Sequence, residues 1–320
     1  MSARFNGPTG LVYDPGAGVT YVADMVNATI RSIDPTGNVS TVAGTPGVTG
    51  SNDGTGTVAT FNGPLGLALD NSNDLFVADS LNDTIRVMSP ITTSVATFAG
   101  SAGSVGSTDG YRTSARFNQP SGLAFDGVAG IYVTDTNNDT IRKIDLNTWT
   151  VSTVAGSAGN VGSTDGSGSN ALFNHPVGIA YDGTAFFYIT DTGNGTIRKM
   201  DAAGNVTTVA GTAGVVGAKN AVGSAASFNQ PLGLAYDGSG HLFVADAGNS
   251  LVRKIVIASK KVSTVLGVAG QAGVIAHTPG APKSVGAGKA GLNDPVGLAF
   301  SPIVGLFIAD EAENVILVEH

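Results

Sequence analysis

Apolar and polar residues alternate in short segments along most of the chain, and residues 120 to 156 show the pattern most clearly. Pro120–Asp126 and Ile131–Asp135 are short segments rich in apolar, β-branched and aromatic residues. Thr140–Ile144 and Val151–Gly156 alternate polar and apolar residues with a period of two. This alternation predicts four β-strands, and the Asp-Gly and Asn-rich steps between them predict tight turns. No stretch has the period and the caps of a helix.

The same group of segments recurs six times, each time after a Phe-Asn-x-Pro motif. Five copies start at Phe5, Phe61, Phe117, Phe173 and Phe228, and an altered sixth copy starts at Leu292. The first four intervals are 55 or 56 residues, and the last is 64. A fixed period means that each repeat is one supersecondary unit packed on its neighbours. Four strands per repeat, without helices, predict an all-β, six-bladed β-propeller that forms a single domain over residues 1–320.

The repeat also has a recognisable internal sequence. Pro-x-Gly-Leu-Ala-x-Asp is followed by a hydrophobic-Tyr/Phe-Val-Ala/Thr-Asp strand and then by Asn-x-Thr-Ile-Arg, as at residues 138–142 and 194–198. This string resembles the NHL repeat, and the resemblance extends over nearly the whole chain. It implies a six-bladed propeller in which the first strand of each blade lines the central channel. It implies little about chemistry, because one propeller fold serves both binding and catalysis.

The sixth copy is incomplete. It supplies three strand-like segments, Pro295–Phe300, Leu306–Asp310 and Asn314–Val318, but no counterpart of Val151–Gly156. The sequence therefore predicts a three-stranded sixth blade with an exposed outer edge along Val315–Val318. A bare edge favours pairing with another chain, so this segment predicts either an edge-to-edge dimer or the boundary of an excised domain.

Composition and charge exclude several classes of function. The net charge of −8 argues against a nucleic-acid surface, which needs clustered Lys and Arg. The longest apolar runs are only a few residues, which argues against membrane insertion. The absence of Cys excludes disulfides and thiolate metal sites. A surface rich in Ser, Thr, Gly and Asn with few Lys favours a secreted or cell-surface setting, although no signal peptide precedes the first repeat.

Two charged positions recur in register. We expect each Asp at the end of a second strand to accept backbone N–H groups in the following turn and to pair with the Arg seven residues on. Six identical copies favour this structural role over a cation-binding collar. The Asp positions are Asp24, Asp79, Asp135, Asp191, Asp246 and Asp310, and the Arg positions are Arg31, Arg86, Arg142, Arg198 and Arg253.

Two further recurring features are interpreted as turns. The Asn-x-Thr steps at Asn27, Asn82, Asn138 and Asn194 match the glycosylation sequon, but their regular spacing favours turn chemistry. The Gly/Ser-rich connectors carry one Asp each, Asp53, Asp109 and Asp165, which is too few ligands for calcium. No metal or cofactor site is predicted.

Departures from the repeat are better candidates for function. The x position of Phe-Asn-x-Pro varies around the ring, and antiparallel alternation places it on the same face as the turn between strands two and three. Gln119, His175 and Gln230 at this position are predicted to contact a ligand at the channel mouth, together with Asp294 of the sixth copy.

The sixth blade and the connector before it depart most strongly. Leu317 replaces the repeat Arg, and the acidic residues Asp294, Asp310, Glu311 and Glu313 gather there. One interpretation is a patch for a cation or basic partner, and the other, which the sequence favours, is a worn terminal repeat. The long connector from Gly267 to Gly291, with His277, Lys283 and Lys289, is a second place where function is expected.

These features favour a non-catalytic interaction module that contacts a protein, peptide or glycan through its loop-rich face. The RNA-binding NHL domains of animal regulators are similar in fold, but that function needs a basic face. The alternative is a propeller enzyme, a hydrolase or lyase, with its site at the channel mouth. A channel lined only by aliphatic, Ser and Thr side chains would contradict it.

The chain lacks the metal-binding residues of the propeller enzymes that it resembles. Peptidyl-hydroxyglycine lyases are similar propellers that hold a channel zinc with His, one of which follows the strand-one Pro. The corresponding residues include no His: Thr9, Leu65, Ser121, Val177, Leu232 and Val296. Lactonase-type propellers hold calcium with Glu, Asn and Asp, but no Glu occurs before Glu311. No catalytic Ser, His and Asp set is evident.

Overall fold

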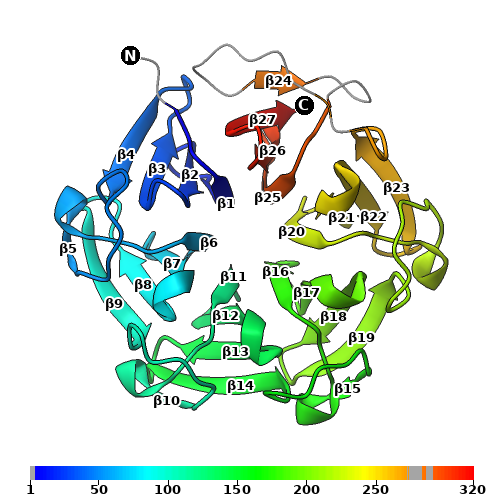
Figure 1. The fold of residues 1–320 in the computed structure, drawn as a ribbon, viewed down its shortest axis with the longest axis horizontal. Coiled ribbons are helices and arrows are strands. Elements are labelled where there is room, and N and C mark those ends of the chain that lie inside the picture. Colours follow the sequence, from blue (N-terminus) through cyan, green and yellow to red (C-terminus); the bar gives the residue numbers. More distant parts are fainter. Residues whose placement is uncertain (1–3, 272, 274–282, 286–290) are drawn as a thin grey trace.

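Six sheets surround a central axis, and the first strand of each repeat lies innermost (Figure 1). The computed structural model describes residues 4–271, 273, 283–285 and 291–320. The all-β, six-bladed propeller predicted from the sequence is confirmed. Each innermost strand starts at the Pro of Phe-Asn-x-Pro, where the missing N–H costs no ladder hydrogen bond.

The strands of each blade follow the chain from the inside outward. Blade one contains β1 (Pro8–Asp14), β2 (Val19–Asp24), β3 (Thr29–Ile33) and β4 (Val39–Ala43). Blade two contains β6 (Pro64–Leu69), β7 (Leu75–Asp79), β8 (Thr84–Met88) and β9 (Ser94–Gly100). Blade three contains β11 (Pro120–Phe125), β12 (Gly130–Asp135), β13 (Thr140–Asp145) and β14 (Thr150–Gly156).

The second half of the ring repeats this order. Blade four contains β16 (Pro176–Tyr181), β17 (Phe186–Asp191), β18 (Thr196–Asp201) and β19 (Asn205–Ala210). Blade five contains β20 (Pro231–Tyr236), β21 (His241–Asp246), β22 (Leu251–Val256) and β23 (Lys261–Leu266). Blade six contains β25 (Pro295–Ser301), β26 (Gly305–Asp310) and β27 (Val315–Glu319), and these are the three strands expected from its repeat.

The connectors between blades are more structured than the turns predicted for them. Three of them add a two-residue outer strand to the following blade: β5 (Gly54–Thr55), β10 (Gly110–Tyr111) and β15 (Gly166–Ser167). Short 3-10 turns follow in four connectors: η1 (Gly56–Val58), η3 (Arg112–Ser114), η5 (Gly168–Asn170) and η7 (Gly223–Ala225). Four more join the second and third strands of a blade: η2 (Ser80–Asn82), η4 (Thr136–Asn138), η6 (Thr192–Asn194) and η8 (Ala247–Asn249). None of the helices in the described residues is long and apolar enough to span a bilayer.

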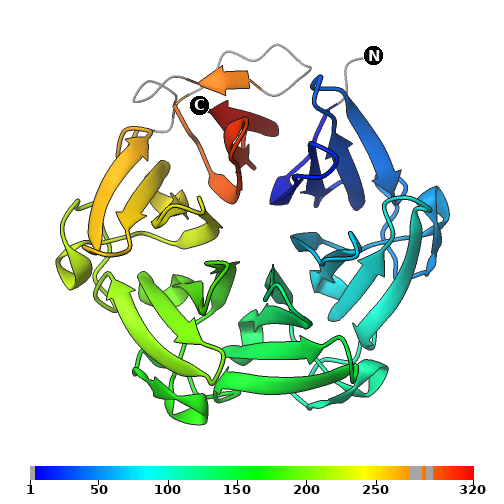
Figure 2. The ribbon, with the colours of Figure 1, turned by 180° about the vertical axis from the view of Figure 1, so that it is seen from behind.

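The exposed outer edge that the sequence predicted for blade six is wrong, because the edge is covered. Val315, Ile316, Leu317 and Val318 are all buried. The backbone of β24 (Lys283–Val285), which comes from the long fifth connector, pairs with β27 in parallel, outside the blade in both Figure 1 and Figure 2. The repeat could not reveal this strand, because every other outer strand is antiparallel and this one arises from an insertion. The predicted edge-to-edge dimer stays a prediction.

Apolar packing between neighbouring blades closes the ring. Blades six and one share a core in which Leu11 and Val22 pack with Phe307 and Ile316. Tyr13 stacks on Phe307, with ring centroids 6.3 Å apart. The chain ends therefore meet through buried side chains rather than through a blade shared between them, and burial of apolar surface supplies the closing free energy.

The innermost strands approach one another too closely for any side chain at one position. A Cβ on Gly122 would overlap the carbonyl oxygen of Val177 in the next blade, and one on Gly297 would overlap that of Thr9 across the closure. The same holds around the ring for Gly10, Gly66, Gly178 and Gly233. The Gly of Pro-x-Gly therefore sets the width of the channel.

Gly122→Ala is expected to lower the free energy of unfolding by about 3 kcal/mol or more, because two backbones must separate. The measurement is urea unfolding followed by circular dichroism. Gly110→Ala in β10 of the same blade is the control, since its Cβ would find ordinary contacts at 3.5 Å, and it should change stability by less than about 0.5 kcal/mol. Equal effects of the two variants would contradict this account of the inner ring.

Candidate binding site

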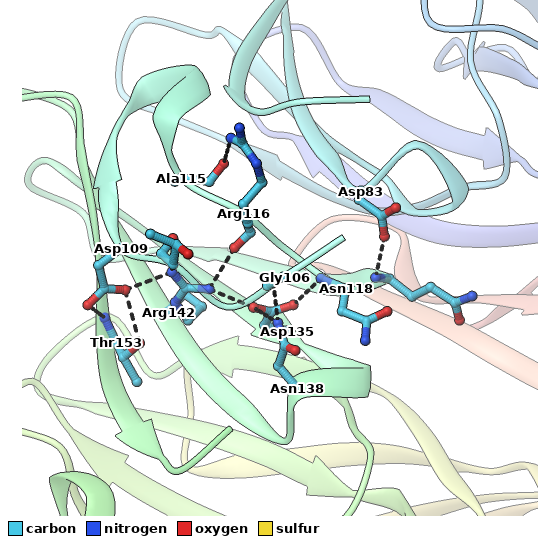
Figure 3. Close-up of polar contacts among 12 residues, drawn as sticks. Asp83, Gly106, Asp109, Ala115, Arg116, Asn118, Asp135, Asn138, Arg142 and Thr153 are labelled. Atoms are coloured by element: carbon cyan, nitrogen blue, oxygen red, sulfur yellow. Dashed lines mark hydrogen bonds and ion pairs between the residues drawn. The ribbon is translucent and has the colours of Figure 1, made fainter. Parts of the chain in front are cut away.

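A buried ion pair joins the second and third strands in each of the first five blades. In blade three the carboxylate of Asp135 lies 2.7 Å from the guanidinium of Arg142, and both side chains are fully buried (Figure 3). Asp135 also accepts the backbone N–H of Asn118 and the side-chain amide of Asn138. Both carboxylate oxygens are thus occupied by donors from the protein. The pairs of the other blades measure 2.6–2.9 Å: Asp24–Arg31, Asp79–Arg86, Asp191–Arg198 and Asp246–Arg253.

The recurring Asn side chains of the Asn-x-Thr steps belong to this arrangement. Asn82, Asn138 and Asn194 are buried and donate to the Asp at the end of the second strand, three residues earlier, at 2.7–2.8 Å. We call this residue, which recurs in all six blades, the ring Asp. Asn249, which is not in a sequon, makes the same contact with Asp246. Turn chemistry therefore accounts for the recurrence of these amides.

A second carboxylate on the Arg of blades two, three and four was missed by the sequence analysis. Asp109, from the connector before blade three, lies 2.7 Å from the far side of Arg142 and accepts two hydrogen bonds from Thr153 of β14 (Figure 3). Asp53 and Asp165 pair in the same way with Arg86 and Arg198. The signal was present in the sequence, since each connector Asp precedes its Arg by 33 residues.

The Phe of Phe-Asn-x-Pro covers the same guanidinium. The centroid of Phe117 lies 5.2 Å from Arg142, and the four equivalent Phe–Arg distances are 5.1–5.5 Å. In blades two to five each Arg therefore links the preceding connector to two strands of its blade. It also fixes the start of the x loop, the Phe-Asn-x-Pro segment, on the face above.

The x loops and the turns between strands two and three lie on one face, as alternation predicted. Backbone hydrogen bonds join them within a blade, for example from Asn137 N–H to the carbonyl of Asn118 and from Gly193 N–H to that of Asn174. Neighbouring blades are joined as well: the N–H groups of Gln119 and His175 donate to Asp83 and Asp139 of the preceding blade, at 2.8 and 2.7 Å.

Three x residues hold an unfavourable backbone conformation. Gln119, His175 and Gln230 have φ of +50°, +50° and +51°, the left-handed region that Gly7 and Gly63 occupy in blades one and two. Their side chains are exposed. A left-handed conformation costs a non-glycine residue about 1 kcal/mol or more, so these side chains are retained where glycine would fit with less strain.

The size of the residue two positions after the ring Asp is related to the size of the x residue. The sequence analysis also missed this relation. Val26 and Leu81 lie over Gly7 and Gly63, where a Cβ would meet them at 2.7 and 2.8 Å. Opposite the larger x residues the same position is Asn137, Gly193 or Gly248. The face therefore has an apolar sector in blades one and two, a polar sector in blades three to five and an acidic sector in blade six.

Blade six lacks the ion pair entirely. Leu317 occupies the position of the Arg and is buried in the apolar core between blades five and six. Asp310 is fully buried, and its partners among the described residues are the backbone N–H groups of Asn293, Asp294 and Glu313. Burial raises the pKa of Asp310, and the charge of Glu313 raises it further.

Glu311 and Asp294 lie together at the mouth of the channel. The N–H of Glu311 donates to the carbonyl of Asp294 at 2.9 Å. Burial raises the pKa of both carboxyls, and the charge of Asp294 contributes to the shift of Glu311. Glu313 accepts a hydrogen bond from Asn293 at 3.1 Å and is not in the channel lining.

A cavity of about 270 Å³ opens at this mouth. All six innermost strands contribute to its walls, through the residues that follow each strand-one Pro: Thr9, Leu65, Ser121, Val177, Leu232 and Val296. Met25 and Glu311 complete the rim, and Glu311 is the one charged residue among the described residues of the lining. No group of three or more metal-binding side chains occurs in the described parts of the chain.

Comparison with known proteins agrees with this geometry. The family model described as NHL repeat matches residues 228–255, which contain the fifth Phe-Asn-x-Pro motif, Asp246 and Arg253. The chain is an NHL-repeat six-bladed β-propeller.

Relatives of this NHL propeller are larger proteins. It is 31% identical over 277 residues to Arabidopsis thaliana Protein SUPPRESSOR OF QUENCHING 1, chloroplastic, covering 82% of this chain and 26% of that protein. It is 31% identical over 180 residues to Homo sapiens NHL repeat-containing protein 2, covering 52% of this chain and 25% of that protein. The propeller therefore spans about a quarter of the length of these curated relatives.

Solved structures of diverse proteins share the fold of this NHL propeller. An auxiliary nutrient binding protein from Bacteroides thetaiotaomicron superposes with a TM-score of 0.70 at 14% identity, covering 98% of this chain and 68% of that one. Virginiamycin B lyase from Staphylococcus aureus, solved with quinupristin, superposes with a TM-score of 0.59 at 12% identity, covering 96% and 78%. At such identities the likeness is one of fold alone.

Arg142→Leu is expected to lower the free energy of unfolding by about 3–5 kcal/mol, because Asp135 is left as an uncompensated buried charge. Arg116→Leu in the same blade is the control. The Arg116 side chain donates only to nearby backbone carbonyls, so about 1 kcal/mol or less is expected.

The double variant Arg142→Leu with Asp135→Asn should recover part of the stability lost in Arg142→Leu, because neither buried charge then remains. Chemical denaturation of the four proteins measures both effects. A double variant less stable than Arg142→Leu alone would show that the ion pair is not the main contribution of Arg142.

Glu311→Gln is expected to stabilise the protein at neutral pH but not in acid. The folded-state pKa of Glu311 is raised above 4.5, so its stabilising contribution is complete below about pH 4.5 and is lost as the pH rises through the folded value. Urea midpoints at about pH 4 and pH 7.5 should therefore separate the two proteins only at the higher pH. A variant less stable than the wild type at the higher pH would contradict the raised pKa.

Proposed function

We propose that this NHL propeller is a non-catalytic interaction module that binds a peptide segment of a partner protein on the face carrying the x loops. The observation that carries the proposal is the set of exposed, left-handed side chains of Gln119, His175 and Gln230 around the cavity mouth. Local strain that glycine would relieve is retained in proteins mainly where a side chain has a use.

The surroundings of these residues suit recognition. The x loops of Gln119, His175 and Gln230 are held by hydrogen bonds to the turns of their own blades, and the first two are also held by the neighbouring blade, so the side chains are presented from a rigid support. Apolar, polar and acidic sectors follow one another around the mouth, which matches the mixed chemistry of protein interfaces.

A peptide is favoured over a glycan by the lining of the mouth. Sugar rings bind best against exposed aromatic faces, and none of the described residues that line this cavity is aromatic. The lining offers aliphatic groups, Met25, two hydroxyls and one carboxylate, which suit an apolar or basic side chain of a peptide.

The enzyme alternative, a hydrolase or lyase, draws support from the fold shared with virginiamycin B lyase. General acid–base catalysis needs side chains of suitable pKa within hydrogen-bond reach of the proton that is transferred. Among the described residues, the cavity lining has Glu311 as its one titratable side chain, beside the hydroxyls of Thr9 and Ser121. The hydroxyl of Ser121 accepts a hydrogen bond from the hydroxyl of Thr136 at 2.8 Å, and no His is among the described residues of the lining. Binding is therefore favoured over catalysis.

Replacing Gln119, His175 and Gln230 together by glycine is expected to weaken peptide binding while leaving the fold intact. Relief of left-handed strain, about 1 kcal/mol per residue, roughly offsets the greater chain entropy of unfolded glycine, about 0.5–1 kcal/mol. Peptides are first selected from a displayed library on the wild-type propeller and then titrated against both proteins. We expect a loss of roughly tenfold or more with an unchanged unfolding midpoint.

The matched control is a triple variant on the opposite face, Val128→Gly with Ile91→Ser and Ile303→Ser, whose native side chains are strongly exposed. It should bind the selected peptides like the wild type. Selected peptides that bind the glycine variant as tightly as the wild type would refute the proposal. Enrichment on a glycan array with no peptide selected would replace the peptide by a glycan.

A further inference from the structure

The cavity at the channel mouth has the size of a single side chain rather than of a folded partner. Its volume of about 270 Å³ lies just below the range of drug-sized ligand pockets, about 300–1,000 Å³, so it has room for a side chain of a bound peptide but not for a folded partner. Its walls are the aliphatic side chains Leu65, Val177, Leu232 and Val296 and the backbone of the glycine ring. Such walls favour a flexible chain of methylene groups over a polar ligand.

One carboxylate marks the rim of this apolar space. Glu311 occupies the first position after β26, where the other blades have Met25, Ser80, Thr136, Thr192 and Ala247. In blades three and four this position is a Thr whose hydroxyl donates to a strand-one carbonyl of the next blade, Pro176 or Pro231. Glu311 cannot donate in this way when ionised, and it is the one acidic residue among the six residues at this position.

Among the described residues, no positively charged side chain competes with a cationic ligand for the carboxylate of Glu311. Its backbone is fixed by the hydrogen bond to Asp294, and Met25 of blade one lines the cavity beside it. Among the described residues no Lys, Arg or His forms an ion pair with Asp294, Asp310, Glu311 or Glu313. A carboxylate that is half buried beside a second one gains most from a ligand that brings its own positive charge.

We propose that the cavity receives a lysine side chain of the bound peptide, with its methylene chain against the aliphatic walls and its ammonium group against Glu311. This inference rests on the proposed function, since it assigns an anchor to the peptide bound on the same face. An ammonium group is a compact charge that one carboxylate can meet. The planar guanidinium of arginine carries five N–H donors in a fixed fork, which a single carboxylate in an aliphatic rim leaves largely unpaired.

The first test uses n-butylamine, which has the atoms of a lysine side chain, and 1-butanol, which is of similar size and uncharged. Titration is followed by NMR of the methyl groups of Leu65, Val177 and Val296. We expect the amine to shift these signals with an affinity roughly tenfold or more above that of the alcohol. Equal affinities, shifts confined to other methyl groups or no shifts at all would overturn the proposal.

Two isosteric variants separate the carboxylate in the cavity from its acidic surroundings. Glu311→Gln should reduce the affinity for the amine to that for the alcohol, and its unfolding midpoint shows that the fold is retained. Glu313→Gln removes a charge two residues away, outside the lining, and should retain most of the affinity. Equal losses in the two variants would assign the effect to the general field of blade six and overturn the specific contact.

The peptides selected on the propeller distinguish failure of this inference from failure of the proposed function. Replacing their lysine by norleucine should cost roughly tenfold or more, whereas replacing it by arginine should not restore wild-type affinity. Peptides whose binding needs Gln119, His175 and Gln230 but no lysine would overturn the lysine anchor and leave the interaction module standing. Binding of butylamine through Glu311 with no peptide selected would overturn the interaction module and show a site for a free amine instead.

Discussion

The buried guanidinium in each of the first five blades is the interaction on which the rest of this structure depends. In blade three, Arg142 is held between Asp135 of its own sheet and Asp109 of the preceding connector, and Phe117 covers its face. The cost of burying such a charge is met by two carboxylates and by backbone carbonyls. One side chain thus fixes three segments that are distant in sequence. Through Phe117 it also fixes the position of the x loop.

Blade six shows the consequences of replacing the buried Arg by an apolar residue. Leu317 keeps the apolar core between blades five and six continuous, so the fold does not need the Arg there. The carboxylates that remain are no longer neutralised by the scaffold, and two of them, Asp294 and Glu311, lie at the channel mouth. A carboxyl whose pKa is raised by burial destabilises the folded chain at neutral pH. The same charge attracts a cationic ligand, so stability and binding are opposed at this position.

The repeat made much of the fold predictable and much less of the site. Strand positions followed from alternation, as in Val151–Gly156, because a strand with one face in a core must alternate. The pairing of Asp135 with Arg142 also followed, since adjacent antiparallel strands bring those residues together. The role of Asp109 was missed although each connector Asp precedes its Arg by 33 residues, because a Gly-rich connector has no alternation of apolar and polar residues that shows where it packs. The strand β24 was missed for the same reason, and the exposed edge predicted for blade six was therefore wrong.

By itself the sequence determined the number of blades, the start of each innermost strand and the set of positions that depart from the repeat. These properties depend on local alternation and on a period, and both can be read along the chain. Only the tertiary structure decided that Gln119, His175 and Gln230 are left-handed and exposed, and that Glu311 brings a charge to the cavity lining. It also decided that the inner glycines bring neighbouring strands into contact. Those properties depend on how six separate segments converge on one axis, and no single segment contains that geometry.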